Sequence, residues 1–299
     1  MMKKIYAFFI LLAACVTALA QKELPLPDVP SDLTVPRLRA EYILYRFWDA
    51  MDWRDTTLTR DAEFMEQNAA NFYNLFQFTD SAGVARAARR MLDGAKTDRR
   101  AYRDVAEIAE LYLFEPESPV VDEESFIVVA DLLLGDDMLD ESDRLRIEDA
   151  RAAAMLNRIG HAATDFEMIT REGDHIMLSE VAKRHPVNIL MFYDPDCHDC
   201  GELERFLADS ELGDAGIIMV SPYGEQDGLW ARHAATMPEG WIVARPISEE
   251  FDDEGLYDIR LTPTVYLLDS SATVLAKHLR RENILKSIDK QIACHGAKE

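Results

Sequence analysis

The chain has 299 residues, 48% of them apolar, which is enough material for two domains with a core each. Its formal net charge of −23 excludes nucleic-acid binding as the main activity, because phosphate backbones would repel it. The four cysteines are too few for a framework of structural disulfides in a chain of this length.

Residues 1–20 have the pattern of an export signal. Two lysines precede an apolar stretch at 5–16, which is too short for a comfortable membrane span, and small residues at 18–20 form a cleavage site. Cys15 also fits the lipidated residue of a bacterial lipoprotein, but we favour cleavage after residue 20 because the residues after Cys15 stay apolar. Either reading predicts an exported protein that is periplasmic or associated with the cell envelope.

Residues 21–36 are rich in proline and are interpreted as an extended linker. Apolar side chains then recur at helical spacing from 37 to 158, which predicts an all-α N-terminal domain. The expected helices cover residues 38–51, 64–75, 81–94, 99–112, 126–133 and 145–156. Their apolar stripes carry neither Cys nor His, so we interpret their aromatic residues as core and assign the domain no chemistry.

Residues 159–299 change to short strands that alternate with helices, which predicts an α/β domain with a mixed central sheet. The expected strands cover 166–170, 175–178, 188–193, 217–220, 241–244, 264–268 and 274–278. Helices are expected at 180–184, 201–207, 226–236 and 281–293.

Cys197-His198-Asp199-Cys200 follows the apolar run at 188–193, at the point where a strand gives way to a helix. A thiol at a helix start meets unpaired backbone N–H groups and the positive end of the helix dipole, which favour the thiolate. The second thiol lies one turn on and can close a disulfide with the first. This arrangement is typical of dithiol–disulfide exchange.

The element order and this motif resemble the thioredoxin-like superfamily, in particular its extracytoplasmic TlpA/ResA-like branch. Two further stretches carry the resemblance: 261–269, Leu-Thr-Pro-Thr-Val-Tyr-Leu-Leu-Asp, is similar to the family's cis-proline segment, and 160–166 to that branch's N-terminal hairpin. The resemblance covers about residues 158–293. The helical half resembles a domain of unknown function that often precedes such modules in exported bacterial proteins, and it implies no activity.

The resemblance implies that Cys197 attacks a disulfide and that Cys200 resolves the mixed disulfide. Thr262 and Pro263, with Pro263 in the cis form, are then expected to bind the substrate strand beside the sulfurs. Asp196 stands where the family usually has Trp. Met191 stands where many members hold a buried carboxylate that moves protons at the second cysteine, so Asp194, Glu202 or water are left as candidates.

Charges around the pair predict the direction of the reaction. Five carboxylates lie within a few residues of the cysteines, against one arginine, Arg205; they are Asp194, Asp196, Asp199, Glu202 and Glu204. A carboxylate at about 4 Å raises the energy of a thiolate by ~1 kcal/mol in water, whereas a helix terminus lowers it by ~0.3–1 kcal/mol. Asp196, Asp199 and His198 are therefore expected to tune Cys197, and the couple is predicted to act as a reductant or isomerase.

Other readings of the cysteines have less support. A zinc site needs two more ligands, and the histidines show no paired spacing, while haem attachment needs His where Gly201 stands. Two alternatives remain. The cysteines could form a merely structural disulfide, or the second domain could be a degenerate, non-catalytic scaffold while the helical domain docks a partner. Since no nicotinamide or flavin fingerprint is present, we expect no cofactor beyond a Cys197–Cys200 disulfide. The expected partners are protein thiols and disulfides and a dithiol donor in the membrane or envelope.

Overall fold

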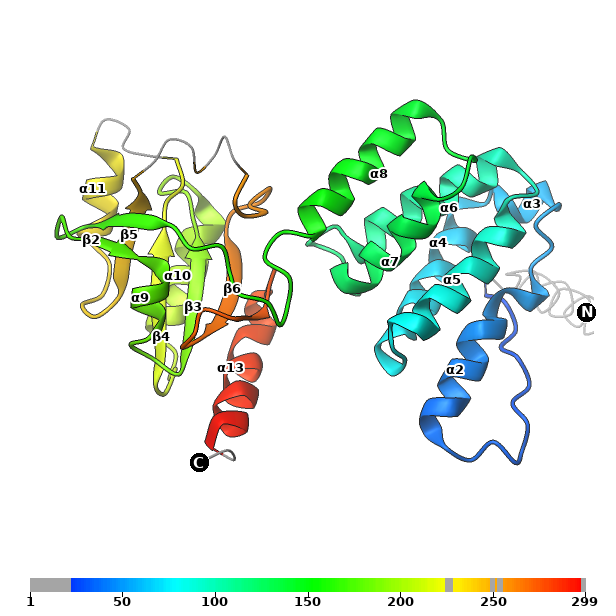
Figure 1. Ribbon diagram of the computed structural model, residues 1–299, viewed down its shortest axis with the longest axis horizontal. Helices are drawn as coiled ribbons and strands as arrows, with labels where there is room; N and C mark the ends of the chain where they lie inside the picture. The colour runs from blue at the N-terminus through cyan, green and yellow to red at the C-terminus, as the bar shows by residue number, and fades with distance from the viewer. Residues whose placement is uncertain (1–22, 224–227, 248–250, 252–254, 297–299) are drawn as a thin grey trace, which may run out of the picture. The chain divides into compact units, whose positions relative to one another are not determined.

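The computed structural model describes residues 23–223, 228–247, 251 and 255–296, with side chains up to 293. The predicted export signal and Cys15 lie outside these residues. The chain divides into two compact units, Met1–Arg151 and Ala152–Glu299 (Figure 1). Residues 152–158, which the periodicity assigned to the helical domain, belong to the second unit. No helix among the described residues is long and apolar enough to cross a membrane.

The first unit is helical. Its elements are α2 (Pro36–Arg46), η1 (Phe47–Ala50), α3 (Thr56–Thr59), α4 (Ala62–Tyr73), η2 (Phe76–Phe78), α5 (Ser81–Ala95), α6 (Arg99–Leu113), α7 (Glu123–Leu134) and α8 (Glu141–Ala154), which runs into the second unit. Aspartates begin most of these helices by accepting backbone N–H groups of the first turn, for example Asp61 from Phe64 and Asp80 from Gly83. The helices enclose the aromatic side chains of Phe47, Trp48, Phe72 and Phe76, which are buried as predicted.

The second unit is built on one mixed sheet. Its strands are β1 (Glu167–Thr170), β2 (His175–Met177), β3 (Val187–Phe192), β4 (Ala215–Val220), β5 (Ile242–Pro246), β6 (Thr264–Asp269) and β7 (Val274–Ala276), in the order β2-β1-β5-β4-β3-β6-β7. Strands β3, β4 and β5 are parallel, and the others pair antiparallel with their neighbours. This is the mixed α/β architecture expected from the sequence.

Alternate side chains of β3 enter two separate cores, because successive residues of a strand face opposite sides of the sheet. Ile189 and Met191 pack in one core with the side chains of α10 (His198–Ala208), α11 (Leu229–Ala234) and α13 (Arg281–Gly296). Leu190 and Phe192 pack in the other with α9 (Leu178–Ala182) and several aromatic rings. All six residues of β3 are buried, so this strand is the centre of the unit.

The register of β3 with β6 determines where the candidate site forms. The strands run antiparallel, and Phe192, the last residue of β3, pairs with Thr264, the first residue of β6. The segment that follows β3 and the segment that precedes β6 therefore meet at one edge of the sheet. The former contains the two cysteines and the latter contains Thr262 and Pro263.

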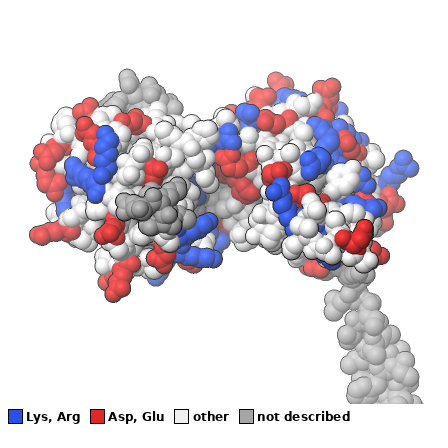
Figure 2. Space-filling view, turned by 60° about the horizontal axis from the view of Figure 1, so that its bottom comes forward, with Lys and Arg blue, Asp and Glu red and all other residues white. Residues whose placement is uncertain are grey.

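Charged side chains of both signs are interspersed on the face of the molecule shown in Figure 2. Although the chain as a whole is strongly acidic, its basic residues do not gather into a stripe on this face. This distribution is typical of an ordinary solvated surface.

Candidate active site

Cys197 is the N-cap residue of α10. Its backbone is extended, and its Sγ accepts the backbone N–H of Cys200 at 3.2 Å. A tight turn places it there, because the Cys197 N–H donates to the Asp194 carbonyl at 3.0 Å and the Asp196 N–H donates to Asp194 Oδ1 at 2.9 Å. An N–H group aimed at sulfur stabilises negative charge on it. The local fold thus presents the first sulfur as a potential thiolate at a helix start, as the sequence predicts.

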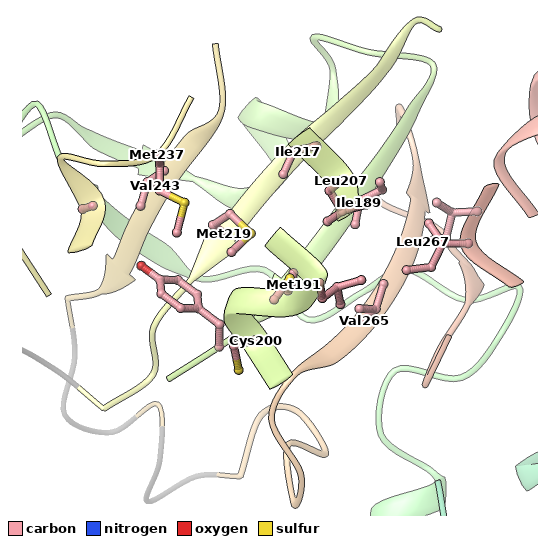
Figure 3. Packing of buried hydrophobic residues seen from close by; sticks show 14 of the residues in the cluster. Ile189, Met191, Cys200, Leu207, Ile217, Met219, Met237, Val243, Val265 and Leu267 are labelled. Atoms are coloured by element: carbon pink, nitrogen blue, oxygen red, sulfur yellow. The ribbon is translucent and has the colours of Figure 1, made fainter. Parts of the chain in front are cut away.

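The two sulfurs differ in exposure. Cys197 is half-buried, whereas Cys200 is fully buried in the core beneath the first turn of α10; both are free thiols in this structure. Figure 3 shows Met191 and Val265, from the adjacent strands β3 and β6, in the core around Cys200. Burial raises the pKa of the Cys200 thiol far above its ordinary value, and its hydrogen bond with Cys197 acts in the same direction. Cys200 is therefore held as a neutral thiol.

Thr262 and Pro263 lie beside the first sulfur. The Thr262–Pro263 peptide bond is cis, and the Cys197 thiol donates to the Thr262 carbonyl at 3.5 Å. The structure thus brings together four of the residues selected from the sequence, from segments 65 positions apart in the chain.

The predicted tuning residues lie on the solvent side. Asp196, His198 and Asp199 are exposed, and the His198 side chain, 82% accessible, has Glu202 Oε1 at 3.6 Å from its Nε2. Their charges act on Cys197 largely through water, where salt screens them. Asp194 is half-buried and its carboxylate accepts the Asp196 N–H.

The segment that leads to Thr262 is fixed by a buried carboxylate. Asp258, 3% exposed, accepts hydrogen bonds from Arg260 Nε at 2.8 Å and Nη2 at 2.9 Å, and lies 3.4 Å from His278 Nε2. Burial by itself would raise the pKa of Asp258, but the hydrogen bonds from His278 and Arg260 outweigh it and hold the pKa well below its usual range. The carboxylate is therefore charged, and it anchors the loop from inside.

Sequence reasoning missed a cluster on the inner side of the cysteine helix. Glu204 of α10 lies 3.3 Å from His233 of α11, between Oε2 and Nε2, and the ring of His233 packs on that of Tyr193 with centroids 5.3 Å apart. From the sequence, Glu204 was only one of the five carboxylates near the cysteines. The spacing of Cys200 and Glu204, four residues apart on one helix, was the available signal, since such residues share a face.

The comparisons with known proteins agree with the division of the chain into a helical first unit and an α/β second unit. Residues 11–157 match the family model described as a domain of unknown function, DUF5106. A thioredoxin-like protein from Bacteroides caccae is similar over 91% of this chain and 99% of its own, with 24% identity and a TM-score of 0.81. No curated protein matches the chain.

Two other solved structures are each similar to less than half of the chain. A conserved protein of unknown function from Bacteroides fragilis shares 34% identity over 43% of this chain and 97% of its own, with a TM-score of 0.40. A domain of a possible thiol-disulfide isomerase from Cytophaga hutchinsonii shares 19% identity over 48% of this chain and 99% of its own, also with a TM-score of 0.40.

The fold and the site define a class of two-domain proteins, in which an all-α first unit precedes a second unit with a thioredoxin-like fold. Residues 11–157 match DUF5106 and the second unit has a thioredoxin-like fold, which confirms the predicted fold class and the resemblance. DUF5106 carries no assigned activity, so the chemistry must be argued from the second unit.

The exposure difference predicts selective labelling of the reduced protein. Iodoacetamide at neutral pH should modify Cys197 at least tenfold faster than Cys200, because Cys200 is buried and its raised pKa keeps it a thiol. Peptide mass spectrometry after timed quenching measures both rates. The same protein in urea is the control, where the two rates should approach each other. Equal labelling of the folded protein would contradict the described burial.

Removing the buried charge of Asp258 is expected to destabilise the folded protein. Asp258→Asn should lower the free energy of unfolding by about 3–5 kcal/mol, because Arg260 and His278 lose their anionic partner. Since the folded pKa is depressed, the contribution of Asp258 is present above about pH 4 and is lost as the pH falls. Urea titrations at neutral and acid pH measure this.

The matched control for that test is Glu282→Gln at the exposed Arg280–Glu282 pair, which should change stability little. Acid sensitivity that is identical in Asp258→Asn and the wild type would contradict the role of the buried carboxylate.

Proposed function

We propose that the protein is a thiol–disulfide oxidoreductase that acts through Cys197 and Cys200. The observation that carries this proposal is the unequal environment of two adjacent sulfurs. One is reachable and caps a helix, and the other is buried beneath it. Relatives of the same fold include a possible thiol-disulfide isomerase, which agrees with this chemistry.

The exchange balances with the residues present. The Cys197 thiolate attacks a substrate disulfide, forms a mixed disulfide and releases one substrate sulfur as a thiolate. Cys200 then loses its proton and attacks Cys197 Sγ, which forms the Cys197–Cys200 disulfide and releases the second substrate thiol. The substrate is thereby reduced by two electrons and the protein is oxidised. No cofactor other than this disulfide is required.

Thr262 and Pro263 are proposed to hold the substrate. The Thr262 carbonyl faces Cys197 Sγ at 3.5 Å, so an extended substrate segment that pairs with this backbone would bring its disulfide to the attacking sulfur. Asp196, His198 and Asp199 would tune the attack from the exposed side. Several of the surrounding groups are acidic, which favours a reductant or isomerase over a strong oxidant.

The setting is proposed to be extracytoplasmic. Residues 1–20 would serve as the export signal, with lipidation at Cys15 as the minor alternative, and residues 21–36 as a linker ahead of a helical domain at 37–158 and a redox domain at 159–299. Oxidised protein would be reduced again by a dithiol donor in the membrane or envelope. The substrates would be disulfides of envelope proteins.

Reduction of insulin by dithiothreitol tests the proposal. The wild type should shorten the lag before turbidity, and Cys197→Ala should abolish this effect, because the attacking sulfur is lost. Cys200→Ala is the matched variant, since it retains attack and should accumulate mixed disulfides with substrate. Equal turbidity curves for the wild type and Cys197→Ala would instead favour a non-catalytic binding module.

A further inference from the structure

Resolution of the mixed disulfide requires that a buried thiol lose its proton. Cys200 is fully buried, and Met191, the residue of β3 that packs near it, offers no proton acceptor (Figure 3). Desolvation disfavours the thiolate, so attack by Cys200 needs a base within the protein. This inference rests on the proposed function and asks which group accepts that proton.

Glu204 lies one helical turn after Cys200 on α10, and the two side chains share the inner face of the helix. The Glu204 side chain is only 13% accessible, and its Oε2 lies 3.3 Å from Nε2 of His233, whose side chain is 21% accessible. Accessibility thus increases from Cys200 through Glu204 to His233. These three side chains mark a route from the buried thiol towards solvent.

Tyr193 adds a hydroxyl to the same place. It is fully buried, in one core with Cys200 and Trp230, and its ring packs on His233. Burial raises the pKa of Tyr193 far above its usual value, and the charge of Glu204 raises it further. The hydroxyl therefore stays protonated and can both donate and accept a hydrogen bond.

Two polar atoms of the pair are left without a partner. Glu204 Oε1 and His233 Nδ1 are buried, and within the part of the chain that the structure describes neither has a hydrogen-bond partner. Leaving buried polar atoms without partners destabilises a protein, so these two atoms are unlike those of a purely structural ion pair. Charged groups in this region also include Arg245, whose guanidinium lies over the Trp230 ring at 5.7 Å, and Arg171, which donates to the carbonyls of Ala234 and Met237.

We propose that the Glu204–His233 pair accepts the Cys200 proton as Cys200 attacks Cys197. The S–H bond of Cys200 breaks, its electron pair forms the bond to Cys197 Sγ, and the bond from Cys197 to the substrate sulfur breaks. The proton moves to the pair and leaves through His233, the more exposed member. An imidazole suits this task because its two ring nitrogens can take up a proton on one side and release one on the other.

The candidates from the sequence fit less well. The Asp194 carboxylate already accepts the Asp196 N–H, and Glu202 is half exposed beside His198 and Arg281. Glu202 also lies two positions from Cys200, which places it on a different side of the helix. It is therefore a suitable control residue.

The test separates attack from resolution in one trace. In a Cys15→Ser, Cys294→Ser background, reduced protein reacts with excess 5,5′-dithiobis(2-nitrobenzoate). Attack by Cys197 releases one equivalent of thionitrobenzoate, and attack by Cys200 on the resulting mixed disulfide releases a second. Stopped-flow absorbance gives both rate constants over a range of pH.

Glu204→Gln should leave the first phase unchanged and slow the second by about 10²-fold at neutral pH, as expected for loss of a general base. The difference should vanish at high pH, where hydroxide removes the proton, whereas a merely structural defect would persist there. Glu202→Gln removes a carboxylate from the same helix and should match the wild type in the second phase. His233→Gln should also slow the second phase and leave the first unchanged. It provides the test if Glu204→Gln does not fold.

An unchanged second phase in Glu204→Gln, or a defect independent of pH, would overturn the proposal for the pair. If the wild type releases only one equivalent and forms no Cys197–Cys200 disulfide, the proposed function itself fails. The two failures are therefore distinguishable.

Discussion

The antiparallel pairing of β3 with β6 is the constraint on which the rest of the site depends. Because Phe192 pairs with Thr264, the chain leaving β3 and the chain entering β6 emerge side by side, and Cys197 Sγ comes to lie 3.5 Å from the Thr262 carbonyl. The register is well specified, since a shift by one residue would turn the apolar side chains of β3 from one core to the other. Both cores are closely packed, so such a shift has no low-energy alternative.

A second consequence of this packing is the asymmetry of the two sulfurs. Cys200, in the first turn of α10, faces the core, whereas Cys197 at the start of the helix is only half-buried. Two cysteines three residues apart therefore differ in reactivity because they differ in burial. The exposed carboxylates around them act through solvent. Glu204 is different because it turns inward with Cys200 and pairs with His233, so its charge acts where screening is weak.

Much of this was predictable from local sequence. The alternation of strands and helices and the cysteines at a strand-to-helix corner each rest on short-range patterns, and the resemblance supplied Thr262 and Pro263. The Glu204–His233 pair was not predictable, because it joins two helices separated by a strand, and the sequence offered only the spacing of Glu204 four residues after Cys200. The boundary predicted at residue 158 falls one residue after the end of the DUF5106 match, whereas the division into compact units falls within α8, at residue 151.

The equilibrium between dithiol and disulfide tests the central claim most directly, namely that these two sulfurs form a reversible couple that favours reduction of its partners. The protein is equilibrated with glutathione buffers of increasing oxidation, and the fraction carrying the Cys197–Cys200 disulfide is measured by mass spectrometry of the peptide that contains both. We predict a midpoint of about −180 mV or more negative, which is the range of isomerases and reductants. No disulfide at any ratio, or a midpoint near about −120 mV as in a strong oxidant, would contradict the account.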